Sequence, residues 1–280
     1  MTLKFGKLIK TAAVAGAAAL LLAGCASSQG SASKAKSNPY HLITAGTILA
    51  ATSGDQPPFA SMDSSGKPSG MIIDVTNAVA KRLDLKVTYK LATTDAGIQG
   101  LSAKQYDMVA NGLGITPDRQ KTLDFAKGLY WSTTALLTKK SSTATSLKDF
   151  SGKKVAVVTG SVQVDYFSQL PGAIQTDFED ENSAVSALNS GSVDAFVVGG
   201  PDAEQYLKKF SSLKIAASAP VDHATTVAFQ KGNSALTDAY DKEVGKMIAD
   251  GSFQKIYKSY FSEKPEPELV KIWPELGDMK

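Results

Sequence analysis

The alternation of short apolar segments with segments of helical periodicity constrains the fold of this chain most strongly. Residues 72–83 ("IIDVTNAVAKRL") lie between short apolar segments. They place Ile72, Val75, Val79 and Leu83 on one helical face. After the Ser/Thr-rich segment 139–146 the same alternation starts again. Strands that alternate with helices are typical of an α/β fold, and the restart predicts two α/β lobes.

The segment boundaries follow from these patterns. Strands are expected at 47–52, 85–91, 106–112, 153–160, 173–178 and 193–200, and helices at 72–83, 95–102, 161–170, 181–191 and 201–210. A chain of 280 residues with 43% hydrophobic content can bury a core of this size.

Residues 1–24 are expected to form a secretory signal peptide. Lys4, Lys7 and Lys10 precede an apolar run from Ala12 to Ala23, which is the usual arrangement of such signals. A run of about a dozen apolar residues is too short for a membrane-spanning helix, which needs roughly 20.

Cys25 is the only cysteine, so no intramolecular disulfide can form. The preceding "LAGC" resembles the lipobox of bacterial lipoproteins, and this resemblance implies that Cys25 carries lipid and becomes the mature N-terminus. Residues 25–39 have the small, polar composition of a flexible tether, so the fold is expected to start near Tyr40. We therefore expect a lipid anchor on the extracytoplasmic face of a membrane, in an envelope with one membrane or two.

Charge and motifs narrow the function. Three of the 30 basic residues lie in the signal, which leaves 27 against 27 acidic residues and no electrostatic reason to expect nucleic acid as a partner. The segment 112–117 ("GLGITP") has proline where a dinucleotide-binding motif needs its third glycine, and the chain has only two histidines. No cofactor and no metal are expected.

Two strand ends are the first places to look for a site, because open α/β sheets bind ligands beyond the carboxyl ends of their strands. They are Gly112 to Thr116 and Gly199 to Asp202. Thr116 is expected to cap a helix with Pro117 at its first position, and free N–H groups at helix starts favour anions. The same features also serve as ordinary helix caps.

Six segments carry a resemblance to a known family. They are "PPF" at 57–59, "GMIIDVTNAVAKRL" at 70–83, "YDMVANGLGITPDRQKTLDF" at 106–125, "LKDFSGKKVAVVTGS" at 147–161, "GSVDAFVV" at 191–198 and "DGSFQKIYKSYF" at 250–261. In this order and spacing, the chain from about Tyr40 to Phe261 resembles the extracytoplasmic solute-binding proteins of polar amino-acid ABC transporters, bacterial family 3.

The resemblance implies a two-lobed type II periplasmic-binding-protein-like fold, with a ligand in the cleft and closure by hinge motion. Two crossing strands are expected at about Thr133 to Thr138 and Thr225 to Gln230, and the C-terminal helices are expected to complete the first lobe. The implied organisation is 1–24 signal peptide, 25–39 lipidated tether, 40–137 plus 228–280 lobe 1, and 138–227 lobe 2. An ABC permease and its ATPase, both separate chains, are the implied protein partners.

Arg119 falls on the family arginine that clamps the ligand's carboxylate, a role suited to a planar, charged guanidinium. Other positions depart from the family: Gln56 and Thr94 replace aromatic residues, Gly114 replaces a serine, and Gly199 replaces the aspartate that grips the ligand's ammonium. Ser161 keeps a hydroxyl, whereas Val162 lacks one. The candidate ligand-binding residues are Arg119, Gln56, Thr94, Asn111, Gly112, Gly114, Ser161, Val162, Gly199 and Asp202.

The ammonium of an amino-acid ligand needs a partner that Gly199 cannot supply. Asp202 is the preferred substitute; Asp55, Asp95 or carbonyls near Asn111 and Gly112 are the alternatives. Without such a partner, free amino acids are expected to bind weakly, and Gly199→Asp is expected to strengthen their binding.

The sequence therefore predicts a lipid-anchored binding protein, not an enzyme, that captures an amino acid or related small carboxylate and delivers it to a permease. One alternative is a surface adhesin that uses the C-terminal segment 264–280, which contains Trp273. A less favoured alternative is a dehydratase-like enzyme with Asp55, Asp95 or Asp202 as proton donor. His223 is expected to make an ordinary polar contact.

Overall fold

The computed structural model describes residues 37–279, without the side chains of Pro220 and Asp222. The predicted signal peptide, Cys25 and most of the predicted tether lie outside the described residues. Within residues 37–279, no helix is both long enough and apolar enough to cross a membrane.

One large mixed sheet runs through the described chain in the order β10-β9-β11-β8-β12-β6-β1-β5, and β7 pairs with β12. Its strands are β1 (Thr47–Thr52), β5 (Lys86–Leu91), β6 (Met108–Gly114), β7 (Leu123–Phe125), β8 (Tyr130–Lys139), β9 (Lys154–Val158), β10 (Ile174–Phe178), β11 (Ala195–Gly199) and β12 (Leu213–Gln230). β1 is parallel to β5 and β6, and β9 is parallel to β10 and β11. A small second sheet contains β2 (Asp55–Gln56), β3 (Ala60–Met62) and β4 (Pro68–Ser69).

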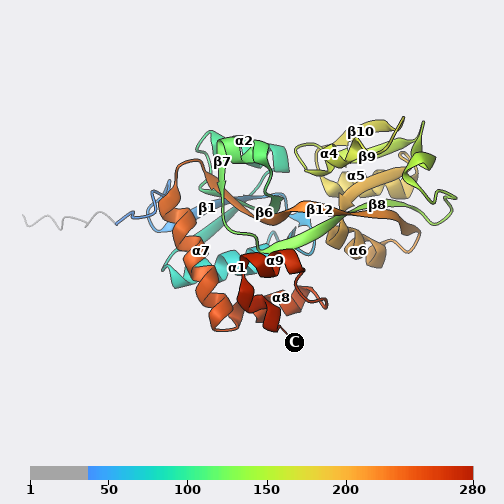
Figure 1. Cartoon of the computed structure of the whole chain (residues 1–280). Coiled ribbons are helices and arrows are strands. Elements are labelled where there is room, and N and C mark those ends of the chain that lie inside the picture. Colours follow the sequence, from blue (N-terminus) through green and yellow to red (C-terminus); the bar gives the residue numbers. More distant parts are fainter. Residues whose placement is uncertain (1–36, 280) are drawn as a thin grey trace, which may run out of the picture. The chain divides into compact units, whose positions relative to one another are not determined.

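Two lobes form around the two parallel parts of the sheet, and β8 and β12 run through both (Figure 1). Lobe 1 contains β1 to β7 with α1 (Met71–Arg82), α2 (Thr94–Ser102), α3 (Pro117–Thr122), α7 (Ser234–Ala249), α8 (Ser252–Tyr260), α9 (Pro267–Ile272) and the 3-10 helix η2 (Pro274–Asp278). Lobe 2 contains β9 to β11 with the 3-10 helix η1 (Leu147–Phe150), α4 (Gln163–Phe167), α5 (Glu181–Ser190) and α6 (Gly200–Lys209). The two-lobed α/β prediction is confirmed, while the exact lobe boundaries stay a prediction.

The two crossing strands are longer than the stretches that the resemblance implies. β8 begins at Tyr130 rather than Thr133, and β12 begins at Leu213 rather than Thr225. The pairing of β12 with β8 changes register between Ile215 and Ala217 and again between Pro220 and Ala224. These irregularities interrupt the two-residue period by which a strand is recognised.

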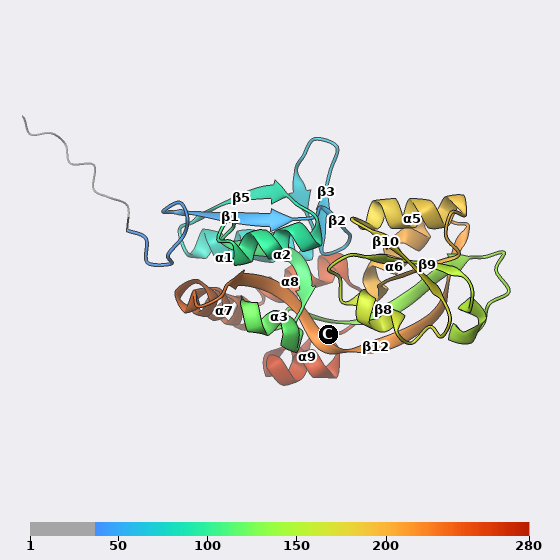
Figure 2. The same ribbon diagram turned by 90° about the horizontal axis from the view of Figure 1, so that it is seen from above.

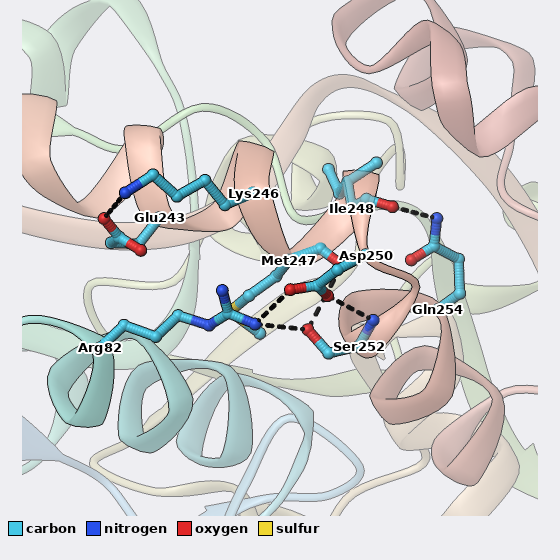
Figure 3. Close-up of polar contacts among 8 residues, drawn as sticks. All are labelled: Arg82, Glu243, Lys246, Met247, Ile248, Asp250, Ser252 and Gln254. Carbon is cyan, nitrogen blue, oxygen red and sulfur yellow. Dashed lines mark hydrogen bonds and ion pairs between the residues drawn. The ribbon is translucent and has the colours of Figure 1, made fainter.

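Lobe 1 buries α1 against the C-terminal helices. Ile72, Val75 and Val79 are fully buried in a cluster that also contains Tyr240 of α7 and Phe253 of α8. At the rim, Arg82 at the end of α1 donates to an Asp250 carboxylate oxygen over 2.6 Å and to Ser252 Oγ over 3.1 Å (Figure 3). Residues far apart in the sequence thus form one core, as the resemblance implies for lobe 1.

Lobe 2 has apolar clusters on both faces of its strands. Val155 and Val157 of β9 belong to one cluster, and Ala156 and Val158 belong to the other. A strand buried on both faces appears in the sequence as a continuous apolar run, and residues 155–158 form such a run.

The C-terminal segment packs on lobe 1. Trp273 is buried and donates its indole N–H to the Gly128 carbonyl over 2.7 Å. Leu269, Leu276 and Met279 join the same core as α1. Burial of these side chains gives the segment a structural role in the fold.

Candidate functional site

All ten candidate residues line one cavity of about 60 Å³ between the lobes. Lobe 1, lobe 2 and both crossing strands contribute to it. The other lining residues are Phe59, Leu113, Ser132, Thr133, Gln163, Glu181, Val221, His223 and Thr225. Asp55 and Asp95, the two alternative ammonium partners, do not line it.

Arg119 projects from α3, whose start follows the predicted pattern. Thr116 precedes the helix and its hydroxyl accepts the Arg119 N–H over 3.3 Å, with Pro117 at the first helical position. The cap fixes the helix start directly after β6, so the Arg119 side chain reaches the cavity at the carboxyl end of that strand.

The Arg119 guanidinium bridges the lobes. Nη1 donates to the Gly114 carbonyl of lobe 1 over 2.9 Å, and Nη2 donates to the Gly160 carbonyl of lobe 2 over 2.5 Å. These bonds use two of the five N–H donors of a guanidinium. Burial lowers the pKa of Arg119 to about 10, against the opposing charge of Asp165, so the side chain remains a cation at neutral pH.

Gly160 allows this bridge because of its backbone. Its φ is +75°, and a Cβ at this position would approach the Asp95 Cβ to 2.9 Å. A side chain at residue 160 would therefore push the loop of lobe 2 away from the start of α2.

Asp202 supplies a carboxylate next to Gly199. The residue is 5% exposed, lines the cavity, and its Oδ1 has no hydrogen-bond partner among the described residues. A Cβ built on Gly199 would overlap Asp202 Oδ2. Asp202 thus occupies the space next to the residue where the family usually has its aspartate.

Burial raises the pKa of Asp202 well above the ordinary aspartate value, and the neighbouring Asp55 charge adds to this effect, although a backbone N–H opposes it. A Cβ at residue 199 would require only the carboxylate end of Asp202 to shift, so the expectation that Gly199→Asp strengthens amino-acid binding stays a prediction.

The absence of a side chain at residue 114 has a similar explanation. A Cβ at residue 114 would overlap the imidazole of His223. The ring of a residue on β12 thus fills the space that a serine side chain would need. His223 lines the cavity, as do its neighbours Val221 and Thr225 on the same strand.

Three buried polar atoms at the cavity lack partners among the described residues: Gln56 Oε1, Ser161 Oγ and Asp202 Oδ1. An unsatisfied buried polar atom costs roughly 1–3 kcal/mol. Asn111 and Thr94 differ, because Asn111 Nδ2 donates to Thr94 Oγ1 over 3.4 Å and Asn111 Oδ1 accepts the Ser53 N–H over 2.7 Å. The cavity therefore favours a polar occupant that can satisfy Gln56, Ser161 and Asp202.

Glu181 is a site residue that the sequence did not reveal. It lines the cavity from the start of α5 and is only 7% exposed. Its carboxyl lies 2.8 Å from the Tyr206 hydroxyl, and its N–H donates to Asp55 Oδ2 over 2.6 Å. In the sequence it is one of three consecutive acidic residues before a helix, a pattern that indicates a solvated helix start and nothing more.

The described residues 37–279 contain no group of three or more His, Cys, Asp or Glu side chains placed to hold a metal ion. The cavity has a cation, Arg119, on one part of its wall and the buried carboxyl group of Asp202 on another. This charge pattern suits a small molecule with charges of both signs.

A two-lobed α/β fold with a polar cavity between the lobes defines a solute-binding protein of the periplasmic type. The sequence model of the bacterial extracellular solute-binding proteins, family 3, matches residues 48–263, and this chain belongs to that family.

Three comparisons show proteins to which this chain is similar. The lysine/arginine/ornithine-binding periplasmic protein of Escherichia coli is 30% identical over 227 residues, which cover 77% of this chain and 87% of the relative. An ancestral arginine-binding protein bound to arginine matches with a TM-score of 0.74 and 33% identity over 78% of this chain and 99% of its own. An ancestral amino acid-binding protein, a precursor of cyclohexadienyl dehydratase, matches with a TM-score of 0.70 and 29% identity over 78% and 96% of the two chains.

Proposed function

We propose that this protein is the lipid-anchored substrate-binding component of an ABC importer, which captures an amino acid or a related small carboxylate and delivers it to a permease. The observation that carries the proposal is the placement of Arg119 and Asp202 on one cavity, each from a different lobe. A ligand with a carboxylate for Arg119 and an ammonium for Asp202 draws the two lobes together. Such a ligand would also satisfy Asp202 Oδ1, which otherwise lacks a partner among the described residues.

Closure of the cleft is the proposed capture step. Arg119 already bonds a carbonyl of each lobe, Gly114 and Gly160. A ligand carboxylate adds a charge-assisted bond to the same guanidinium, and these bonds are about twice as strong as neutral ones. The closed form is then recognised by a permease and its ATPase, as in the ABC importers to which this family belongs.

A binding role is favoured over catalysis. The relatives named above are described as binding proteins, and the one associated with a dehydratase is described as an amino acid-binding precursor. Of the acids proposed as proton donors for a dehydratase, Asp55 and Asp95 do not line the cavity. An adhesin role based on segment 264–280 loses its main support, since Trp273 is buried against lobe 1.

A thermal-shift screen tests the proposal. Amino acids, their keto acids and short peptides are added separately to the protein, with L-arginine, L-lysine and L-ornithine included because relatives bind them. A ligand at 100 times its dissociation constant stabilises by roughly 2.7 kcal/mol. A shift with at least one amino acid or small carboxylate, lost in Arg119→Ala, supports the proposal; the absence of any shift across the screen contradicts it.

A further inference from the structure

Glu181 lies where the two lobes meet, beside the proposed ligand site. Figure 2 shows α5, which begins with Glu181, next to β2 of lobe 1. The Glu181 N–H donates to Asp55 Oδ2 over 2.6 Å, and Gln56 Nε2 lies 3.5 Å from Glu181 Oε1. Both contacts join lobe 2 to lobe 1, so the protonation state of Glu181 affects closure of the cleft between the lobes.

The hydrogen bonds around Tyr206 indicate whether the Glu181 carboxyl is protonated. The Tyr206 hydroxyl oxygen lies 3.0 Å from the Asp55 carbonyl oxygen and 2.8 Å from Glu181 Oε2, and all three groups are buried. A phenol has one hydrogen to donate, and a carbonyl oxygen can only accept. With an ionised Glu181, three buried oxygen atoms would share one hydrogen.

A neutral Glu181 satisfies all three atoms. Tyr206 then donates to the Asp55 carbonyl, and the Glu181 carboxylic acid donates to the Tyr206 oxygen. Burial raises the pKa of Tyr206, which keeps its hydrogen in place.

We infer that Glu181 is a protonated carboxylic acid in the closed form and a positioning residue that joins the lobes around the ligand. The inference rests on the proposed function for its effect on binding, while the protonation itself is a property of the closed protein. Closure from a solvated open cleft then takes up a proton at Glu181.

The surrounding charges agree with a neutral Glu181. Burial is the main reason that the pKa of Glu181 lies well above the ordinary value of 4.5, and the negative charges of Asp202 and Asp55 raise it further. Hydrogen bonds from Tyr206 and Gln56 lower this pKa. These four groups come from β2 and α6. None of the four is a cation that would stabilise an ionised Glu181.

The sign of the pH effect follows from the raised pKa. A group whose pKa is higher in the closed form favours that form fully below its ordinary value, near 4.5, and the preference disappears as the pH rises through the raised value. Ligand affinity should therefore fall with rising pH in this window, by at most about tenfold per pH unit for one proton.

The experiment is calorimetry of the full chain with L-arginine and L-glutamine, each titrated in two buffers of different ionisation enthalpy across this pH window. The difference between buffers measures protons bound on closure, at most about one for Glu181. Glu181→Gln keeps the shape and donates to Tyr206 through its amide, so it should take up fewer protons and its affinity should lose the pH dependence of the parent in this window. Glu204→Gln, which removes an exposed carboxyl from the same helix as Asp202, should change nothing.

Infrared spectroscopy separates this inference from the proposed function. A protonated carboxylic acid has a carbonyl band that an ionised carboxylate lacks, and in any sample in which the cleft is closed the band should be present in the parent and reduced in Glu181→Gln, whether or not an amino acid closes it. Equal proton uptake and equal carbonyl bands in parent and Glu181→Gln would overturn the inference. If neither amino acid binds but the band difference is present, the assignment of Glu181 stands and its effect on ligand retention is refuted for these two probes.

Discussion

Replacing Asp202 by asparagine should selectively weaken ligands that carry an amine. The carboxylate is 5% exposed and its Oδ1 lacks a partner among the described residues, so it can accept an ammonium without losing another bond. Asparagine has nearly the same shape but no charge, so the variant removes the ion pair and leaves the cavity filled.

The magnitude follows from the burial of the pair. A hydrogen bond to a charged group contributes about 1.5–3 kcal/mol. Loss of the charge should thus raise the dissociation constant of an amino acid roughly 10- to 150-fold at neutral pH. The keto acid that lacks the amine should bind the parent and Asp202→Asn within about threefold of each other, since its carboxylate depends on Arg119.

The assay is isothermal titration of parent and Asp202→Asn with the amino acid that gives the largest thermal shift and with its keto acid. Glu204→Gln is the matched control, because it removes a carboxyl from the exposed side of the same helix. Equal losses for amino acid and keto acid would show that Asp202 acts on the cavity as a whole. No loss for the amino acid would refute the ammonium role outright.

The position of the carboxylate can be tested separately. Gly199→Asp alone should strengthen amino-acid binding, because it adds a carboxylate at the family position and needs only the end of the Asp202 side chain to shift. Gly199→Asp combined with Asp202→Ala moves the carboxylate to the family position and should keep affinity within roughly tenfold of the parent. If the single variant binds amino acids no more tightly than the parent, a carboxylate at residue 199 does not reach the ammonium.

Three further outcomes are expected. Arg119→Ala should lower affinity roughly a hundredfold without unfolding the protein, and unchanged affinity by calorimetry would exclude the carboxylate role. Cys25→Ser should release the protein from washed membranes or leave an unprocessed precursor; unchanged processing and membrane retention would contradict a lipid anchor. Trp273→Ala should destabilise by about 3–5 kcal/mol in chemical denaturation, whereas a stability equal to that of the parent would show that the C-terminal segment is dispensable for the fold.

The fold was largely predictable because its signals are local. The strand at 47–52 has the predicted limits, and the helix expected at 72–83 spans Met71–Arg82. The beginning of β12 was missed because two register shifts and Pro220 interrupt its alternation. The periodicity of a strand depends on regular pairing, and β12 pairs irregularly over its first half.

A residue of the candidate site could be predicted only where the neighbouring sequence contains a recognisable signal. Arg119 follows a recognisable cap at Thr116, so its placement at the end of β6 could be inferred. Glu181 and Tyr206 have no such signal, since each looks like an ordinary residue of a helix. Their roles arise from the approach of α5 and α6 to β2, which brings residues separated by more than a hundred positions together.

The two glycine departures from the family pattern have one physical explanation. At Gly114 the space of a side chain is filled by His223, and at Gly199 it is filled by Asp202. A missing side chain therefore leaves no gap in this cleft, because a residue from another position supplies a polar group in its place. It follows that restoring the family residue at either glycine requires the end of the His223 or Asp202 side chain to shift, so the polar group beside the glycine changes place together with the substitution.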